Sequence, residues 1–253
     1  MDIATHLSQK HLSVSVIIPA RNEAPNLQHV LPLIPSFVSE VILVNGHSTD
    51  DTVTVAQDLL STIRIVEQTG RGKGDAIKAG LAVSTGDMVV LMDADGSADP
   101  LEIPRFIETL LADNEFAKGS RFIEGGRSHD ITRFRRAGND GLILLVNVLF
   151  GTRFSDLCYG YNAFWRHCLD HIEIDSDGFE IETLINIRMH LAGLKTTEVP
   201  SIEYKRIHGT SNLNVVRDGW RIWKLIWKEY KGMKQQRVVT ATQPQGIPEE
   251  AVL

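Results

Sequence analysis

The sequence predicts an α/β protein in which a mostly parallel central sheet is flanked by helices. Over the first hundred residues, short runs rich in β-branched residues alternate with stretches of helical periodicity. This alternation is typical of parallel strands joined by helices, and the strands are apolar throughout, as expected when both faces of a sheet are buried. With 253 residues, of which 43% are hydrophobic, the chain can form one large domain around a sizeable core.

The predicted elements follow one another closely along the chain. In the first half we expect strands at 13–18, 40–44, 63–67 and 88–92, separated by helices at 26–37, 52–60 and 74–84. In the second half we expect helices at 100–111, 143–150 and 180–191, and a strand at 196–200. Open parallel sheets bind ligands at the carboxyl ends of their strands, so the residues that follow each strand are the candidates for chemistry.

Composition and charge exclude several classes of protein. A net charge of −6 lacks the basic excess of nucleic-acid-binding proteins. The two cysteines, Cys158 and Cys168, occur without a secretory signal, which favours a reducing compartment, and we expect a cytoplasmic protein. No apolar run approaches the roughly 18 to 20 residues that cross a bilayer. The most apolar stretch, 142–150, predicts a helix in the core or along a groove.

Two carboxylates follow the fourth predicted strand. Asp93 and Asp95 stand two residues apart, and their hard oxygen ligands suit Mg²⁺ or Mn²⁺. A cation held there could neutralise a diphosphate, which points to a nucleotide-sugar site. Acidic residues are also common in loops and helix caps, as Asp99 before Pro100 illustrates, so this pattern alone is weak.

A glycine-rich loop, GRGKG at 70–74, precedes the third predicted helix. It offers backbone amides, the positive end of a helix and two cations to a phosphate or to nearby carboxylates, although a flexible connector could share its composition. Gly74 stands where the phosphate-binding loop of ATPases requires Ser or Thr, which disfavours an ATPase. The first strand lacks a following GxGxxG motif, which disfavours a dinucleotide-binding dehydrogenase.

Several ordered motifs together resemble family 2 glycosyltransferases. In the first half these are SVIIPARNE at 15–23, VNGHSTDDT at 44–52, the GRGKG loop and DADGSADP at 93–100. In the second half, GSRF at 119–122, DLCYGYNAF at 156–164, GFEIE at 178–182 and RIHGTS at 206–211 resemble dolichol- and polyprenyl-phosphate sugar transferases. The resemblance covers about 13–230 and implies an inverting, metal-dependent hexosyltransferase with a Rossmann-like GT-A fold.

The resemblance also implies a domain organisation. We expect one GT-A domain at 13–232, with a nucleotide-binding half at 13–99 and an acceptor half at 100–232. An N-terminal tail would occupy 1–12. The stretch 233–253 is polar, contains proline and glycine and lacks periodicity, and we expect a disordered tail.

By the same resemblance, individual residues receive roles. Donor binding is expected from Pro19, Ala20, Arg21, Glu23, Asn45, His47, Lys73, Asp93 and Asp95. Metal binding, with Mn²⁺ or Mg²⁺ as cofactor, is expected from Asp93, Asp95 and Ser97. Acceptor or phosphate binding is expected from Arg121, Arg135, Arg136, Arg206, His208 and Ser211, since guanidinium groups match phosphate oxygens.

Two departures from the family pattern bear on these roles. Ser97 stands where close relatives often have a metal-contacting Gln, and its shorter hydroxyl would reach an ion through water. Asn45 and Gly46 stand where Asp is common, which leaves the nucleotide preference open between UDP and GDP.

The chemistry depends on the acceptor. A phosphate monoester has a second pKa near roughly 6, so a lipid phosphate arrives ionised and needs cations more than a base. A hydroxyl needs a general base, for which Asp156, Glu180 and Glu182 are available. We expect Asp156 and Glu182 near the acceptor, with Asp95 as a third catalytic residue. Polyprenyl or dolichyl phosphate is the expected acceptor, while a soluble hydroxyl acceptor or a non-catalytic nucleotide-sugar-binding protein remains an alternative.

The segment 220–230 predicts an amphipathic C-terminal helix. Trp220, Ile222, Trp223, Ile226, Trp227 and Tyr230 share one side at helical spacing, and Arg221, Lys224 and Lys228 lie on the flank. Aromatic residues beside cations are typical of a helix at a membrane interface, which would place the protein peripherally on the inner membrane face. The alternative is that this side packs on the core of the protein.

Overall fold

A computed structural model describes residues 3–210 and 214–242 of the chain, with side chains as far as residue 235. Its centre is a seven-stranded sheet in the order β3-β2-β1-β4-β7-β5-β8. The strands are β1 Val14–Ala20, β2 Glu40–Asn45, β3 Arg64–Glu67, β4 Met88–Leu91, β5 Phe116–Ser120, β7 Asn162–Trp165 and β8 Thr196–Pro200. Only β7 runs antiparallel to its neighbours β4 and β5, so the sheet is mostly parallel, as predicted.

The first half follows the predicted alternation of strands and helices. Helices α2 Ala24–Val30, α3 Thr52–Leu59 and α4 Lys73–Val83 connect β1 to β4. The prediction of a helix at 26–37 was wrong in its length, because α2 gives way to a single 3₁₀ turn at Leu31–Leu33. Pro32 and Pro35 explain this end, since proline has no N–H to donate and clashes with the preceding turn.

The second half contains two strands that the sequence did not indicate. β5 reads FAKGS and β7 reads NAFW, so neither shows an apolar run, and both are nevertheless buried in the middle of the sheet. Lys118 of β5 is completely buried and lies 3.4 Å from Glu198 of β8. A short second sheet pairs β6 Arg127–Ser128 with β9 Ile202–Glu203.

The second half also supplies the longest helices. α5 Ile103–Leu111 follows a 3₁₀ turn at Pro100–Glu102, and α7 is Ile181–Leu191. α6 runs over Arg133–Phe150, ten residues earlier than the predicted start at 143. The first turns of α6 are polar, so the apolar pattern of the sequence did not indicate them. Thr132 caps the helix by accepting a hydrogen bond from the Arg135 amide.

Two predictions about the termini were wrong for the described residues. Residues 3–9 form helix α1 Ile3–Gln9, whose Leu7 is buried in the core. α8 is Val215–Thr242, so the first part of the expected disordered tail is helical. Met233 explains the continuation, because it extends the buried face of α8 into a cluster with α6 and α7. Residues 243–253 lie outside the described part of the chain.

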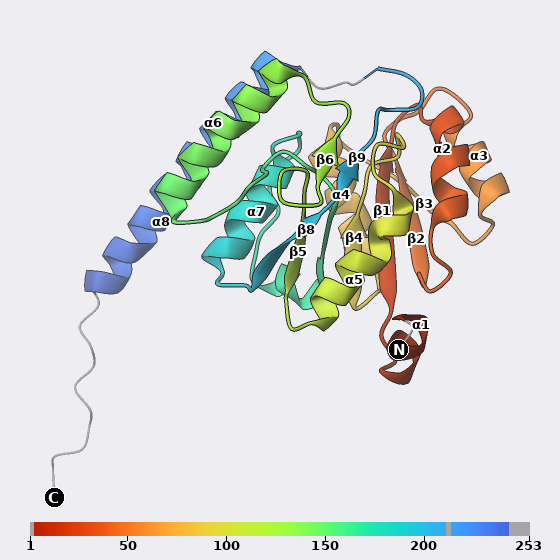
Figure 1. Cartoon of the computed structure of the whole chain (residues 1–253), viewed down its shortest axis with the longest axis horizontal. Helices are drawn as coiled ribbons and strands as arrows, with labels where there is room; N and C mark the ends of the chain where they lie inside the picture. Colours follow the sequence, from red (N-terminus) through yellow and green to blue (C-terminus); the bar gives the residue numbers. More distant parts are fainter. Residues whose placement is uncertain (1–2, 211–213, 243–253) are drawn as a thin grey trace, which may run out of the picture.

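The helices form layers around the sheet. One core cluster joins a face of the sheet to α2, α3 and α5, and a second joins the opposite face to α4 and α7. α6 and α8 lie side by side at one edge of the molecule, as Figure 1 shows, and a third cluster packs them on α7. Within the described residues, no helix is long and apolar enough to cross a membrane.

Candidate active site

A cavity of about 830 Å³ opens at the carboxyl ends of β1, β2 and β4. Residues that follow these strands form one end, and the first turns of α6 and α8 form the other. The sheet topology explains this position, because parallel strands end together and their loops meet there. The cavity therefore joins the two halves that the sequence analysis distinguished.

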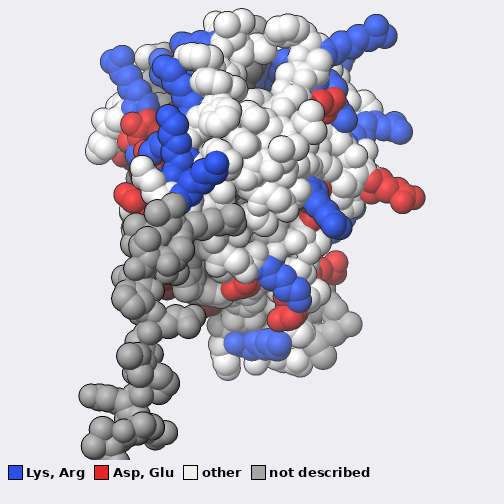
Figure 2. Space-filling view, turned by 90° about the vertical axis from the view of Figure 1, so that its left-hand side faces the viewer, with Lys and Arg blue, Asp and Glu red and all other residues white. Residues whose placement is uncertain are grey.

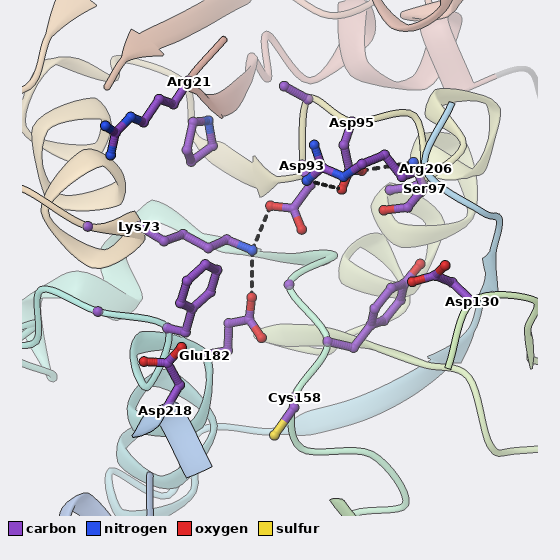
Figure 3. Close-up of a pocket in the computed structure, with 18 of the residues that line it drawn as sticks. Arg21, Lys73, Asp93, Asp95, Ser97, Asp130, Cys158, Glu182, Arg206 and Asp218 are labelled. Carbon is purple, nitrogen blue, oxygen red and sulfur yellow. Dashed lines mark hydrogen bonds and ion pairs between the residues drawn. The ribbon is translucent and has the colours of Figure 1, made fainter. Parts of the chain in front are cut away.

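Lys73 occupies the centre of the cavity. Its Nζ lies 2.6 Å from Asp93 Oδ1 and 2.6 Å from Glu182 Oε1, as Figure 3 shows. Burial by itself would lower the pKa of this ammonium group, but the two carboxylates raise it well above its usual range. Burial and the neighbouring Asp93 raise the pKa of Glu182, against the opposing effect of Lys73. We call these three residues the Lys73 cluster.

Close backbone contacts fix the Lys73 cluster in place. A Cβ atom at Gly160 would lie 2.5 Å from both Lys73 Nζ and Glu182 Oε1, so a larger residue there would have to displace the ends of these two side chains. Gly72 has a φ of +103°, and a Cβ there would lie 2.2 Å from the carbonyl oxygen of Asp177. The GRGKG loop is therefore a tight packing surface and not a flexible connector.

Two backbone amides of the GRGKG loop, those of Gly70 and Gly74, already have partners within the protein. Gly74 and Asp75 donate to the Asp177 carbonyl at 2.9 and 3.3 Å, and Gly70 donates to Asp75 Oδ2. The start of α4 thus binds its own protein backbone. The contribution of this loop to the cavity comes from its side chains, chiefly Lys73 and Arg71.

Asp95 lies beside a second cation. Its Oδ2 is 2.9 Å from Arg206, whose guanidinium also contacts Glu23 Oε1 at 2.8 Å. The other Asp95 oxygen accepts a hydrogen bond from the Ser97 amide at 2.9 Å. Burial raises the pKa of Glu23, although its hydrogen bonds from Asn26 and Arg206 oppose this effect.

The donor set fits a divalent cation that completes its coordination with a substrate. Asp93, Asp95 and Ser97 all line the cavity, and they present hard oxygen atoms. Among the residues that the structure describes, no group of three or more His, Cys, Asp or Glu side chains is arranged around a common metal position. Mg²⁺ and similar ions commonly use one or two protein carboxylates together with substrate phosphates, which matches this site.

The expected donor-binding residues gather at one end of the cavity, with one exception. Pro19, Ala20, Arg21, Glu23 and His47 line it. Asn45 does not, because its amide donates to both oxygens of Glu67 at 2.9 Å and its carbonyl accepts from the Ser48 amide. Direct contact between Asn45 and a ligand therefore stays a prediction, and in this structure its hydrogen bonds shape the loop that carries His47.

Asp156 and Arg121 form a closed ion pair. The carboxylate is 0% exposed and accepts hydrogen bonds from Arg121 Nε at 2.7 Å and Nη2 at 2.9 Å. Arg121 also contacts Glu203 at 3.0 Å and the Cys158 carbonyl at 3.1 Å. Burial alone would raise the pKa of Asp156, but Arg121 lowers it below its ordinary value. We call Arg121, Asp156 and Glu203 the Arg121 cluster.

This geometry corrects two expectations. Asp156 is not among the residues that line the cavity, and a fully paired carboxylate is a poor proton acceptor, so it does not fit the role of a base. Arg121 reaches the cavity wall, but its nitrogen atoms are directed to protein partners and not to a ligand. Both residues instead fix the loop that leads to Gly160.

The other expected acceptor residues fall into different places. Arg135 lines the cavity and pairs with Asp130 at 3.2 Å. Arg136 lies outside it, stacked 3.4 Å from the Phe122 ring centre and paired with Asp140. His208 is not among the lining residues and stacks on His29, so its contact with a phosphate stays a prediction. Ser211 lies outside the described residues.

Several lining residues were missed by the sequence analysis. They include the cations Lys205, Arg217 and Arg221 and the apolar side chains Phe179 and Ile222. The proximity of Lys205 to the RIHGTS motif could have indicated its place. Of the carboxylates near α7, Glu182 lines the cavity, whereas Glu180 bonds Ser176 and does not.

Comparison with known proteins identifies the family. Residues 15–173 match the family described as Glycosyl transferase family 2. The chain belongs to this family of glycosyltransferases. Relatives include glycosyltransferase AglJ of Haloferax volcanii, with 30% identity over 222 residues that cover 87% of this chain and 72% of AglJ. The dolichol-phosphate mannosyltransferase of Pyrococcus furiosus is 29% identical over 232 residues, which cover 88% of this chain and 64% of that protein.

Further relatives support the same grouping. The undecaprenyl-phosphate mannosyltransferase of Micrococcus luteus is 28% identical over 217 residues, 80% of this chain and 88% of the relative. Among solved structures, glucosyl-3-phosphoglycerate synthase from Mycobacterium tuberculosis with Mn²⁺ and UDP-glucose superposes with a TM-score of 0.71. It shares 22% identity, covering 92% of this chain and 84% of that one. This likeness confirms the predicted GT-A fold.

Proposed function

We propose that this family 2 glycosyltransferase transfers a hexose or related sugar, with inversion, from a UDP- or GDP-sugar to a polyprenyl or dolichyl phosphate. The names of two relatives, a dolichol-phosphate and an undecaprenyl-phosphate mannosyltransferase, describe such acceptors. The observation that carries the proposal for this chain concerns the carboxylates of the cavity.

Every carboxylate that lines the cavity in the described residues is paired with a cation. They are Glu23, Asp93, Asp95, Asp130, Glu182, Glu203 and Asp218, and their partners are Lys73, Arg121, Arg135, Arg206 and Arg217. A neighbouring cation opposes the action of a carboxylate as a general base, although burial outweighs this effect at Glu23 and Glu182 and raises their pKa. Because a cation already engages each of these carboxylates, we infer that the site suits an acceptor that is already ionised better than a hydroxyl that must lose a proton.

The donor would lie at the acidic end of the cavity. Pro19, Ala20 and Arg21 would contact the nucleoside, and Asp93 with Asp95 would hold Mn²⁺ or Mg²⁺, with Ser97 beside them. When bound, this cation supplies the positive charge that stabilises the departing nucleoside diphosphate. Lys73 adds a second, permanent positive charge and orients Asp93.

The acceptor phosphate would lie at the other end. Arg135, Lys205, Arg217 and Arg221 line this part of the cavity, next to the first turns of α6 and α8. Guanidinium groups bind phosphate oxygens in pairs, so they can orient one oxygen towards the anomeric carbon of the sugar. The positions of these cations favour a negatively charged acceptor.

α8 carries the surface that would meet a membrane. At about 100° per residue, its side chains divide into three arcs. The buried arc is Ile222, Leu225, Ile226 and Met233; the aromatic arc is Trp220, Trp223, Trp227 and Tyr230; the cationic arc is Arg217, Arg221, Lys224, Lys228 and Lys231. The single apolar side expected from the sequence is thus two neighbouring arcs of the helix. Its aliphatic residues pack on the core, and its tryptophans lie beside them.

Two residues of the aromatic arc, Trp220 and Trp223, are exposed, whereas Trp227 and Tyr230 are partly buried. Trp220 is 54% exposed and stacks on Trp223 with ring centres 4.8 Å apart. Leu144 and Val148 of α6 are also exposed. Figure 2 faces this side of the molecule and shows a broad uncharged area bordered by both basic and acidic side chains. Tryptophan beside cations is the composition of helices that lie in the headgroup region, so we propose contact with the inner membrane face.

Transfer of radiolabel tests the proposed reaction. A panel of UDP- and GDP-sugars with Mn²⁺ or Mg²⁺ is incubated with short polyprenyl phosphate, and label is counted in the organic phase. We expect label with the wild type and a loss of about 100- to 1000-fold with Asp95→Ala. Asp58→Ala, on the exposed side of α3, is the matched control. Label only in a water-soluble product would favour a hydroxyl acceptor, and donor binding without transfer would favour a non-catalytic binder.

Vesicle sedimentation tests the membrane surface. We expect the protein to sediment with vesicles that contain anionic lipid and to lose this binding in the double variant Trp220→Ser, Trp223→Ser. Leu59→Ser, an exposed leucine on α3, is the control. Equal sedimentation of the double variant and the wild type would contradict the proposed contact.

A further inference from the structure

The Arg206 side chain contacts a carboxylate that a bound metal ion would also need. Its guanidinium lies between two carboxylates, with Asp95 Oδ2 at 2.9 Å and Glu23 Oε1 at 2.8 Å. Figure 3 shows this side chain next to Asp95, apart from the Lys73 cluster. Asp95 is also one of the carboxylates to which the proposed function assigns the cation.

Asp95 has few free positions for a further ligand. The Ser97 amide donates to Oδ1 and Arg206 donates to Oδ2. A dication that approached Asp95 would meet the positive charge of the guanidinium about one hydrogen-bond length away, and like charges at such distances repel strongly in a partly buried site. Cation binding and the Asp95–Arg206 contact therefore oppose each other.

The backbone around Arg206 is anchored independently of this side chain. Tyr204 and Ile207 donate to the carbonyls of Ser97 and Asp95, and the His208 amide donates to Asn26 Oδ1 at 2.9 Å. Asn26 Nδ2 in turn donates to the His208 carbonyl at 3.2 Å. The segment 204–208 can thus remain in place while the long side chain of Arg206 changes partner.

Glu23 offers the second partner. It is buried, with a side-chain exposure of 8%, and it contacts Asn26 in addition to Arg206. A buried carboxylate without a cation is costly, so Glu23 would retain the guanidinium after Asp95 released it. After it leaves Asp95, the Arg206 side chain would therefore still have a carboxylate partner, so its displacement costs little free energy.

Asp93 differs in this respect. Its cation, Lys73, is also held by Glu182, but the Asp93 side chain is 36% exposed, against 15% for Asp95. Asp93 can accept a further ligand from the open side of the cavity without the loss of its lysine. Lys73 would also repel a cation at Asp93, but the more exposed Asp93 can bind one from its open side, so the competition is strongest at Asp95.

We propose that Arg206 competes with the divalent cation for Asp95 and moves fully onto Glu23 when the cation binds, so that this arginine sets the metal affinity of the site. The inference rests on the metal-dependent function proposed above. It gives Arg206 a positioning role that is separate from any contact with a substrate phosphate. It also makes Glu23 the residue that permits the exchange.

Direct Mn²⁺ binding to the full chain, without sugar donor, tests the inference. Free Mn²⁺ is measured by electron paramagnetic resonance in titrations of the wild type and of variants. We expect Arg206→Gln to bind Mn²⁺ about tenfold more tightly, since a charge-assisted contact that the ion must break is gone. Glu23→Gln is expected to bind more weakly, because Arg206 then has only Asp95 as a charged partner.

Two controls separate this competition from a general effect of charge. Arg135→Gln removes a cation from the same cavity that pairs with Asp130 and not with Asp95, and we expect its Mn²⁺ affinity to change less than twofold. In the Arg206→Gln background, Glu23→Gln should lose most of its effect, since its role is to receive the arginine.

The outcomes distinguish the inference from the proposed function. Unchanged or weaker binding by Arg206→Gln, with Mn²⁺ bound by the wild type, would overturn the inference and leave the proposed function intact. An equal gain in Mn²⁺ affinity in Arg206→Gln and Arg135→Gln would also overturn the inference. The loss of any positive charge from the cavity would then explain the result. Absence of Mn²⁺ binding to the wild type, with or without UDP, would instead refute the metal dependence itself.

Discussion

The Lys73 cluster and the Arg121 cluster contain the same types of group and differ in what surrounds them. In the first, one ammonium group serves two carboxylates, and Asp93 opens onto the cavity. In the second, the guanidinium donates through several nitrogen atoms, and Asp156 is completely enclosed. A charged side chain that remains accessible can act on a ligand, whereas one that is fully paired and enclosed contributes to the stability of the fold.

The direction of the pKa shifts reflects the same difference. Burial and Asp93 raise the pKa of Glu182, because one lysine must stabilise two negative charges. The pKa of Asp156 is lowered in spite of its burial, because Arg121 provides hydrogen bonds as well as charge. The number of donors that a cation presents thus decides how fully its partners are stabilised.

Loss of the lysine should give the largest effect on activity. Lys73→Met leaves Asp93 and Glu182 without their common cation, and we expect sugar transfer per folded molecule to fall about 100- to 1000-fold. Initial transfer rates measure this. Lys78→Met is the matched control, since its partner Asp177 is exposed and the change should cost less than twofold. If Lys73→Met transferred sugar at the wild-type rate, the proposed difference between a cluster that acts on the ligand and one that holds the fold would be wrong.

Loss of the arginine should appear mainly in stability. Arg121→Met leaves Asp156 buried and unpaired, and we expect the free energy of unfolding to fall by about 3–5 kcal/mol. Urea denaturation measures it. Arg136→Met, a partly exposed arginine on α6 that loses only its pair with Asp140 and its stacking on Phe122, should cost no more than about 1 kcal/mol. If Arg121→Met kept wild-type stability and lost transfer, Arg121 would belong to the reaction and not to the fold.

The loop between the clusters should be sensitive to a single methyl group. Gly160→Ala would force a Cβ against Lys73 and Glu182, and we expect transfer to fall about ten- to a hundredfold through misplacement of the ion pair. The free energy of unfolding should fall by about 1–3 kcal/mol. Gly141→Ala is the control, because no heavy atom of the protein lies within 4 Å of its added Cβ. Similar rates for both variants would show that the ion pair tolerates displacement.

Acid should weaken the Arg121 cluster with a defined sign. The folded-state pKa of Asp156 lies below its unfolded value, so its stabilising contribution is present above about pH 4 and is lost as the pH falls through the folded pKa. Unfolding of the wild type and Asp156→Asn is measured against pH. We expect the difference in stability between them to be constant near neutrality and to shrink below about pH 4. A constant difference down to pH 2 would contradict this assignment.

The sequence predicted the nucleotide-binding half well because its signals are local. β1, β2 and β4 are short runs rich in apolar residues, and each is followed by polar residues at the point where a parallel sheet binds ligands. Asp93 and Asp95 could therefore be placed at the cavity from their position after β4 alone. The strands β5 and β7 gave no such signal, since Lys118 and Asn162 interrupt their apolar character and find their partners only in the folded protein.

What the sequence by itself determined was the α/β class, the GT-A resemblance and several of the charged residues around the cavity. Only the tertiary structure decided which charged side chains face the cavity and which are enclosed in buried ion pairs. Asp156 and Glu182 look alike in the sequence, yet one is enclosed by Arg121 and the other lies beside Lys73 at the cavity. The reason is physical: periodicity and motifs depend on neighbours along the chain, whereas the pairing of buried charges depends on contacts between segments far apart, which exist only after folding.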